Sequence, residues 1–127
     1  APIRAGRILL PLVKEGGSIG FMTAILGSVG GRTHGYAELY SASKAALNML
    51  IRTFSIELRQ RNPQALCVGL HPGTVDTALS KPFQAGVDPS KLFSPTQSAE
   101  ALLGVLDRLT TADTGRLWAW DGEPIPF

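Results

Sequence analysis

Two short apolar runs on either side of a long helical stretch limit the folds open to this chain. The runs cover residues 18–24 and 65–70, and glycines bound the first of them. Short apolar runs of this kind are typical of strands that are buried on both faces, as in a parallel sheet. Residues 38–61 have strong helix propensity and end before Asn62-Pro63. This order predicts parallel strands joined by a right-handed helical crossover.

The alternation of helices and strands continues on both sides of this unit. Residues 2–14 predict a helix that Pro11 kinks or ends early. Residues 94–109 predict another helix, which opens with a capping box, and residues 115–120 predict the last strand. The chain is therefore expected to form one α/β domain over residues 1–127, with three strands and three helices.

The helix over residues 38–61 has apolar residues around most of its girth. One stripe contains Leu47, Leu50, Ile51, Phe54 and Leu58, and the residues that widen it are Ala42, Ala46, Met49 and Ile56. A helix with this pattern is expected to be buried on two sides. One side would cover the sheet and the other would meet a partner subunit; in a monomer the helix would simply be more enclosed.

The composition argues against several classes of function. The chain is 44% hydrophobic and 17% charged with a net charge of only +2, so it lacks the basic clusters of a nucleic-acid-binding protein. No apolar run approaches the roughly 20 residues of a membrane span, and the first residues lack the layout of a signal peptide. His34 has no partner at metal-ligand spacing, and Cys67 lies in an apolar run that suits a structural thiol. A cytoplasmic protein without a metal site is expected.

Tyr40 and Lys44 lie four residues apart at the start of the long helix, so they share one helix face. A lysine beside a tyrosine favours the phenolate and lowers a phenol pKa that is ordinarily near 10. Such a tyrosine can donate or accept a proton near neutral pH. The same spacing occurs in many helices whose Tyr and Lys are merely solvated, so the chemistry depends on the residues around the pair.

Two loops follow the predicted strands. Residues 25–36 are rich in glycine but lack the Gly-x-Gly-x-x-Gly pattern of a phosphate-binding turn. Residues 72–77 come directly after the second strand, at the end of a parallel sheet where open α/β folds bind ligands. Residues 78–93 are irregular and rich in turn formers, and a loop of this length predicts a lid or binding loop.

These motifs, taken together and in order, resemble the C-terminal half of a short-chain dehydrogenase/reductase. The matching motifs are Tyr40-Ser41-Ala42-Ser43-Lys44 at the helix start, the 72–77 segment, the long loop, and the late helix and strand. Residues 25–28 and 44–48 are most similar to the C-factor/sniffer-like carbonyl reductase branch. The resemblance covers essentially the whole chain and implies the C-terminal part of a Rossmann-type doubly wound parallel sheet.

The resemblance implies an NAD(P)-dependent oxidoreductase that moves a hydride between nicotinamide and a small carbonyl or alcohol substrate. Tyr40 would be the acid/base, and Lys44 would lower its pKa and bind the nicotinamide ribose. The cofactor, NAD or NADP, would contact Thr23, Tyr40, Lys44, Pro72, Gly73, Thr74, Val75 and Thr77. Residues 78–93 would close over the substrate, and a homodimer or homotetramer is expected.

One departure from the family pattern concerns a catalytic serine. Aligning residues 25–28 with the family places Ala24 at the serine's position, with Thr23 just before it. Losing a donor to the substrate oxygen can lower the rate on the order of a hundredfold. Thr23 and Ser28 are the candidates to replace it, although Ser28 lies about one turn of loop later.

A second departure is that the family's N-terminal dinucleotide-binding half has no counterpart in this sequence. The pyrophosphate-binding turn and the residue that selects NAD or NADP belong to that half, and the family's catalytic asparagine would precede Ala1. The isolated 127-residue chain is therefore expected to bind cofactor poorly and to be inactive. The strand over residues 18–24 is expected to have an unpaired edge.

Two other interpretations remain open at this point. The chain could be a non-catalytic interaction module that associates through its long helices, 2–14 and 38–61. Alternatively, the natural protein could contain the missing half outside this sequence. The intact mass of the natural protein separates them: a mass near 13.5 kDa indicates a fragment, and roughly twice that mass indicates an ordinary member of the family.

Overall fold

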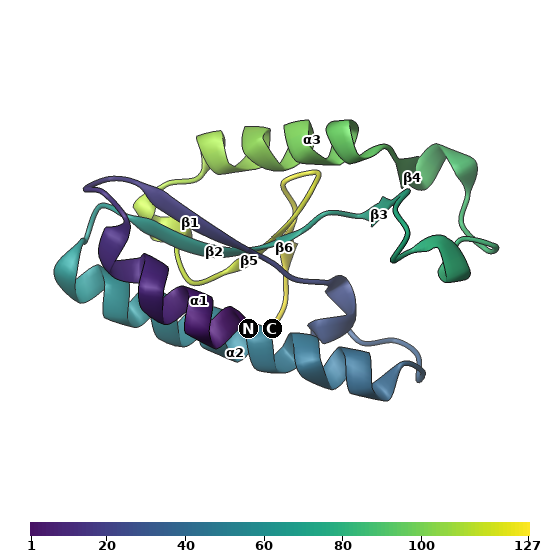
Figure 1. Ribbon diagram of the computed structural model, residues 1–127, viewed down its shortest axis with the longest axis horizontal. Helices are drawn as coiled ribbons and strands as arrows, with labels where there is room; N and C mark the ends of the chain where they lie inside the picture. The colour runs from purple at the N-terminus through teal and green to yellow at the C-terminus, as the bar shows by residue number, and fades with distance from the viewer.

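A computed structural model describes residues 1–127 and shows a mixed α/β fold (Figure 1). Helix α3 covers one face of the central sheet, and helices α1 and α2 lie side by side on the other face. The helices and strands are α1 Pro2–Leu9, β1 Ser18–Met22, α2 Glu38–Arg61, β2 Leu66–His71, β3 Thr74–Val75, β4 Leu92–Phe93, α3 Pro95–Arg108, β5 Leu117–Ala119 and β6 Pro124–Ile125. None of the helices combines the length and the apolar character that crossing a membrane requires.

The central sheet has the strand order β1-β2-β5-β6. Strands β1, β2 and β5 are parallel, with Ser18 opposite Leu66 and Gly69 opposite Leu117, which confirms the three parallel strands predicted from the sequence. Strand β6 pairs with β5 in the antiparallel direction, so the end of the chain adds a strand that the sequence did not predict. The chain can reverse there because Gly122 has a φ of +86°, which glycine adopts without strain.

Strands β3 and β4 pair with each other in a separate parallel sheet. The prediction of an irregular loop through residue 93 is therefore wrong at its end, because Leu92 and Phe93 form β4. Each of these strands is only two residues long, so no alternation of side chains could reveal it. Between them, residues 76–91 form a loop that contains two short 3-10 turns.

Two hydrophobic clusters fill the layers on either side of the central sheet. The cluster beneath α1 and α2 includes Leu47, Ile51, Phe54, Leu58, Cys67 and Leu117. The cluster beneath α3 includes Val68, Leu70, Leu102, Val105 and Trp118. Strand β2 thus supplies Cys67 to one cluster and Val68 to the other, as expected for a strand that is buried on both faces.

Helix α1 ends at Leu9, and a 3-10 turn over Leu10–Leu12 follows it. The early end was expected from Pro11, whose ring removes a backbone donor and clashes with the preceding turn. Most of the apolar side of this segment is exposed, including Leu12 at 72%. The helix packs instead through Gly6, where any Cβ would clash with the Phe54 ring of α2.

Helix α2 buries one of its two apolar sides within this chain. The residues that face the sheet are Leu47, Ile51, Phe54 and Leu58. The residues that stay exposed on the opposite side, here called the outer stripe, are Ala42, Ala46, Met49 and Ile56. Of the two sides of α2 that were predicted to be buried, the chain itself therefore buries only one. The outer stripe is available to a partner.

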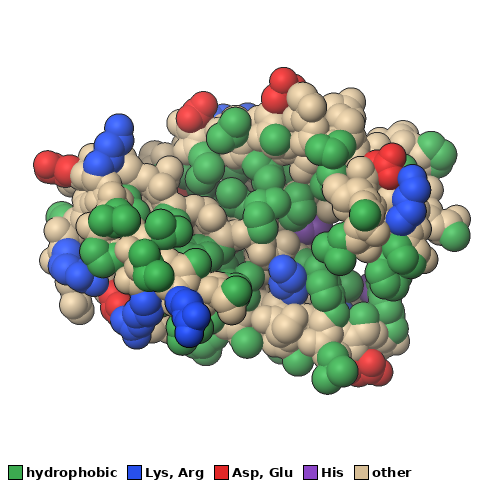
Figure 2. Space-filling model, viewed as in Figure 1, with side chains coloured by type: hydrophobic (Ala, Val, Ile, Leu, Met, Phe, Trp, Pro, Cys, Tyr) green, Lys and Arg blue, Asp and Glu red, His purple; other side chains and the backbone are tan.

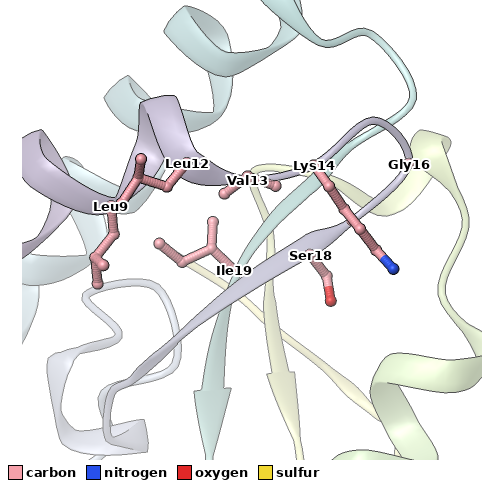
Figure 3. A pocket seen from close by; sticks show the side chains of 8 residues that line it. Leu9, Leu12, Val13, Lys14, Gly16, Ser18 and Ile19 are labelled. Atoms are coloured by element: carbon pink, nitrogen blue, oxygen red, sulfur yellow. The ribbon is translucent and has the colours of Figure 1, made fainter.

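Strand β1 pairs only with β2, so its other edge carries unpaired backbone groups, as the sequence predicts. A groove of about 640 Å³ between the end of α1 and β1 is lined by Leu9, Leu12, Val13 and Ile19 among others. Figure 3 shows the Ile19 side chain extending toward Leu9, while Lys14 points away from them. Hydrophobic side chains also reach the surface over this face of the molecule (Figure 2). An open strand edge beside apolar side chains favours association with a further strand.

Candidate active site

Tyr40 and Lys44 lie one turn apart near the start of α2, as the sequence predicts. Lys44 Nζ is 5.7 Å from the centroid of the Tyr40 ring, and it donates a 3.3 Å hydrogen bond to the Met22 carbonyl oxygen. Met22 is the last residue of β1, so this bond holds the ammonium group at the carboxyl end of a parallel strand. Tyr40 is 42% exposed. The pair therefore borders the edge of the sheet at which α/β folds bind ligands.

Burial raises the pKa of the Tyr40 phenol above its ordinary value. The sequence predicts a lower pKa because of the charge on Lys44, and that prediction is wrong in this structure. The ammonium group is bonded to Met22 and lies 5.7 Å from the ring centroid, so the desolvation of the phenolate outweighs its attraction to the lysine. Tyr40 is consequently protonated at neutral pH, the state in which a phenol can donate a proton.

The Pro72–Gly73 turn follows β2 directly and lies at the same end of the sheet. Gly73 has a φ of +76°, and a Cβ there would lie 2.7 Å from Phe93 Cε2, so the turn requires glycine. Ser98 of α3 donates a 2.9 Å hydrogen bond to the Pro72 carbonyl oxygen. Because Met22 lies opposite Leu70 in the sheet, the strand end that Lys44 contacts is next to the strand end that leads into this turn.

The remaining predicted cofactor residues on this segment continue from the turn into the long loop. Thr74 and Val75 are partly buried and form β3. Thr77 is exposed, and its backbone N–H donates to Ser80 Oγ at 3.3 Å. The structure therefore places Pro72 through Val75 along the sheet edge and Thr77 at its margin.

The loop over residues 76–91 is tied together by its own polar contacts. Lys81 Nζ lies 3.2 Å from Asp76 Oδ1 and forms a salt bridge with it, and Gln84 Nε2 donates to the same oxygen at 3.1 Å. Hydrogen bonds from Gln84 and Lys81 lower the pKa of the Asp76 carboxyl. Leu79 and Phe83 nevertheless point into solvent, with Phe83 77% exposed. The loop is thus an organised segment with apolar side chains free to meet a ligand.

Thr23 lies at the end of β1, but its side chain does not face the crevice. It is 4% exposed, and its hydroxyl donates a 2.5 Å hydrogen bond to Asn48 Oδ1. Asn48 in turn donates from Nδ2 to the Gly27 carbonyl oxygen at 3.0 Å. The hydroxyl of Thr23 is therefore engaged within the fold, on the side of Asn48.

Ser28 is also engaged elsewhere. It is buried; its hydroxyl donates to the Pro126 carbonyl oxygen and accepts a 3.0 Å hydrogen bond from the Gly31 N–H. These bonds join the glycine-rich loop to the end of the chain. Both candidate hydroxyls are therefore engaged in hydrogen bonds within the fold, and Ala24, which lies between them in the sequence, has no hydroxyl.

Arg32 organises the loop before the Tyr40 helix, a role that the sequence did not reveal. Its guanidinium group donates to the carbonyl oxygens of Leu26, His34 and Tyr36 and to Ser41 Oγ. It also lies over the Tyr36 ring. Ala37, the residue before α2, has a φ of 56°, a conformation that costs roughly 1–2 kcal/mol for a residue other than glycine. Arg32 holds the chain on both sides of this strained residue and so fixes the start of the helix that carries Tyr40.

His71 is a partly buried titratable group next to the Pro72–Gly73 turn. Burial lowers the pKa of its imidazole below the ordinary value of 6.5, and the nearby Asp121 opposes this shift only in part. Its Nδ1 atom is buried without a hydrogen-bond partner in the chain. The neutral ring is therefore the form that the folded protein favours.

Acid should weaken the fold through His71. Since the folded pKa is below the unfolded value of 6.5, the unfolded chain binds more protons in this range, and the free energy of unfolding falls as pH drops below about 6.5 toward the folded pKa. His71→Asn is expected to remove this part of the slope in urea unfolding measured between pH 7 and pH 5, and His34→Asn, at an exposed histidine, is expected to keep it. An unchanged slope in His71→Asn would show that another group causes the acid sensitivity.

No group of three or more His, Cys, Asp or Glu side chains is arranged to hold a metal ion. The chemistry on offer at the sheet edge is instead proton donation by Tyr40, a positive charge at Lys44 and backbone polar groups along residues 72–75. The sequence indicated these residues but not Asn48. The signal that could have revealed Asn48 is that it is a polar residue beside the apolar stripe of the helix.

The short chain dehydrogenase family matches this chain over residues 1–88. The C-signal protein of Myxococcus xanthus is 33% identical over 128 residues, which cover 99% of this chain and 72% of that protein. The 1-hydroxy-2-glutathionyl-2-methyl-3-butene dehydrogenase of Rhodococcus sp. (strain AD45) is 36% identical over 121 residues, which cover 95% of this chain and 51% of that protein.

Two solved structures share the fold over 99% of this chain and 52% of their own chains. The carbonyl reductase Sniffer of D. melanogaster is 29% identical with a TM-score of 0.82, and the NADPH-bound carbonyl reductase from chicken fatty liver is 28% identical with a TM-score of 0.80. The chain thus spans about half the length of these reductases and of the Rhodococcus protein. The resemblance predicted from the sequence is confirmed, and the chain belongs to the short-chain dehydrogenase/reductase family.

Proposed function

We propose that the natural protein is a cytoplasmic NADP-dependent carbonyl reductase that interconverts a small carbonyl compound and its alcohol. The observation that carries this proposal is the position of Tyr40 and Lys44 at the end of β1, beside the Pro72–Gly73 turn at the end of β2. Relatives described as a dehydrogenase and as NADPH-bound and other carbonyl reductases support it. The NADPH bound to the chicken reductase favours NADP over NAD for this protein.

The residues at the sheet edge fit the nicotinamide end of the cofactor. Lys44 has donor hydrogens beyond the one that it gives to Met22, and Tyr40 is partly exposed; these two side chains would bind the ribose hydroxyls. The partly buried backbone of residues 72–75, with Thr77 at the margin, would bind the nicotinamide amide. Thr23 would contribute through its backbone, because its hydroxyl is bonded to Asn48. The bound cofactor supplies the hydride that reduces the carbonyl carbon.

Tyr40 would donate the proton that the carbonyl oxygen needs. Its raised pKa keeps the phenol protonated at neutral pH, which suits the reductive direction. Lys44 would stabilise the phenolate left after the transfer, because a cation within a few ångströms lowers the free energy of the anion in a partly desolvated site. The positive charge of Lys44 would therefore offset part of the cost that burial adds to the loss of the Tyr40 proton.

The loop over residues 76–91 indicates an apolar substrate. Leu79 and Phe83 are among its exposed side chains and do not pack on the helix below them. Apolar side chains on an organised loop beside an active site are expected to line a ligand pocket once the ligand is bound. We therefore propose a carbonyl compound with an apolar substituent.

Cofactor titration tests the proposal directly. The 127-residue chain is expected to bind NADPH and NADH only weakly, because its residues offer contacts for the nicotinamide end alone. Fluorescence titration of each cofactor measures this, and a micromolar Kd for the isolated chain would contradict the expectation. The natural protein should bind NADPH more tightly than NADH and should oxidise it when a carbonyl substrate is added.

A non-catalytic interaction module is the second candidate function. The outer stripe of α2 is exposed, the edge of β1 is unpaired, and Ala24 provides no donor to a substrate oxygen. These features favour a protein that associates as a homodimer or homotetramer whether or not it is an enzyme. Light scattering of the natural protein tests the association: a monomer at high concentration would contradict the use of these surfaces.

A further inference from the structure

We propose that Phe93 and Trp120 form an aromatic clamp on Gly73 that couples the loop of residues 76–91 to the Pro72–Gly73 turn. The two ring centroids are 4.6 Å apart with an interplanar angle of 59°. A Cβ on Gly73 would lie 2.7 Å from Phe93 Cε2 and 2.9 Å from Trp120 Cδ1. Both rings therefore pack closely against Gly73, the residue whose left-handed conformation defines the turn.

Trp120 is the fixed side of the clamp. It comes directly after β5 in the central sheet and packs against the hydrophobic clusters on both faces of that sheet. A side chain held from both layers of the core moves little when a surface loop moves. The Ser98 hydroxyl, which donates to the Pro72 carbonyl oxygen at 2.9 Å, fixes the turn from the α3 side.

Phe93 is the side of the clamp that belongs to the loop. It ends β4, where Val75 is its partner in the parallel pair with β3. The Asp76 N–H donates a 2.8 Å hydrogen bond to the Phe93 carbonyl oxygen, so the two ends of the loop meet at this residue. The loop is internally braced by the Asp76–Lys81 salt bridge. Displacement of the braced loop at its base would therefore move the Phe93 ring relative to Gly73.

This geometry gives Phe93 and Trp120 a positioning role in the proposed reaction. The role rests on the proposed function, in which the backbone of residues 72–75 holds the nicotinamide. A ligand that orders the turn would stabilise the loop in its present place, and a substrate that orders the loop would stabilise the turn, because coupling between two sites is reciprocal. Exposed loop residues such as Phe83 contact substrate in this scheme but do not transmit the coupling.

Hydrogen exchange measured by mass spectrometry on the natural protein tests the clamp without any ligand. Phe93→Leu is expected to speed exchange in peptides that cover residues 72–76 and in peptides that cover residues 77–91. The expected increase is about 2- to 10-fold, which corresponds to the loss of one aromatic pair. Phe93→Tyr keeps the ring and is expected to restore wild-type exchange. Phe83→Leu, on the same loop, is the matched control and should leave residues 72–76 unchanged. Faster exchange in the loop alone would overturn the proposal.

The unmutated protein provides a test that does not depend on a variant that folds. Exchange at increasing urea concentration should show one common opening for residues 72–76 and 77–91, at a lower free energy than that of β2. Two separate openings would contradict the clamp.

Addition of NADP⁺ to the natural protein separates this inference from the proposed function. Protection of 72–76 and 77–91 together, reduced in Phe93→Leu, is the expected result. Protection confined to 72–76 would overturn the clamp and leave the function intact. Common opening without ligand combined with no protection by NADP⁺ would support the clamp and overturn the function.

Discussion

Replacing Tyr40 with phenylalanine is expected to lower carbonyl-dependent NADPH oxidation by the natural protein about 10²- to 10⁴-fold, the range contributed by a positioned general acid. The Tyr40 ring lies 5.7 Å from Lys44 Nζ, which is itself bonded to the last residue of β1. The Tyr40 hydroxyl is not needed for folding, because the side chain is 42% exposed. The free energy of unfolding should therefore change by only about 0.5 kcal/mol or less.

Tyr36→Phe is the matched control for this experiment. Tyr36 is exposed, precedes the same helix, and its ring contacts His34, with ring centroids 4.8 Å apart, and Arg32. Its loss of a hydroxyl should leave the rate of NADPH oxidation within a factor of about two. Unchanged carbonyl reduction in Tyr40→Phe would contradict the enzymatic function itself and favour the interaction module.

Replacing Ala24 with serine is expected to raise the same rate on the order of a hundredfold. Ala24 directly follows Thr23 at the end of β1, and it is the position at which the resemblance to the family predicts a hydroxyl that donates to the substrate oxygen. The neighbouring hydroxyls cannot compensate, because Thr23 donates to Asn48 and Ser28 donates to the Pro126 carbonyl oxygen. A new hydroxyl at residue 24 would stabilise the oxygen as negative charge develops on it, so the gain should appear in kcat.

Ala42→Ser is the control for the gain of activity. It adds the same hydroxyl on the outer stripe of α2, which is exposed and away from the sheet edge, and it should leave kcat unchanged. An Ala24→Ser variant that folds and shows no gain in kcat would contradict this prediction. It would indicate that the substrate oxygen already has another hydrogen-bond donor.

The elements that the sequence predicted well are those whose signal is local. The capping box of α3 appears as expected, with Ser94 and Gln97 bonded to each other's backbone groups, and Pro11 ends α1 early. The parallel strands were predicted from two short apolar runs, and β2 is buried on both faces as expected. The prediction of burial on both faces is wrong for β1, whose residues alternate between exposed and partly buried because no helix covers one of its faces within this chain. Tyr40 and Lys44 share a helix face because helix geometry alone requires it.

The features that the sequence missed depend on contacts between distant segments. Thr23 and Asn48 are hydrogen-bonded although they lie 25 positions apart in the chain. Phe93 contacts Trp120 because the ends of β4 and β5 both lie near Gly73. Such partners follow from packing and leave no periodic pattern. The wrong pKa direction for Tyr40 has the same origin, since the balance of burial and charge depends on where the Lys44 ammonium group is bonded.

The apolar patterns of α1 and α2 were read correctly as apolar, but the sequence could not say which surfaces the chain itself covers. A hydrophobic pattern counts apolar faces and does not identify their partners. The outer stripe of α2, the exposed side of α1 and the edge of β1 are surfaces that the contacts within this chain leave uncovered.

The central claim is that Tyr40, Lys44 and the Pro72–Gly73 turn together support hydride transfer to a carbonyl carbon. The most direct test follows the hydride itself: the natural protein is incubated with NADPH that carries deuterium at both C4 positions of the nicotinamide and with an apolar aldehyde or ketone, and the alcohol is analysed by mass spectrometry. The predicted result is one deuterium on the carbon that bears the new hydroxyl. Tyr40→Phe samples should form this labelled alcohol about 10²- to 10⁴-fold more slowly. Absence of labelled alcohol in the wild-type reaction across a panel of apolar carbonyl compounds, with NADPH shown to be bound, would contradict the account.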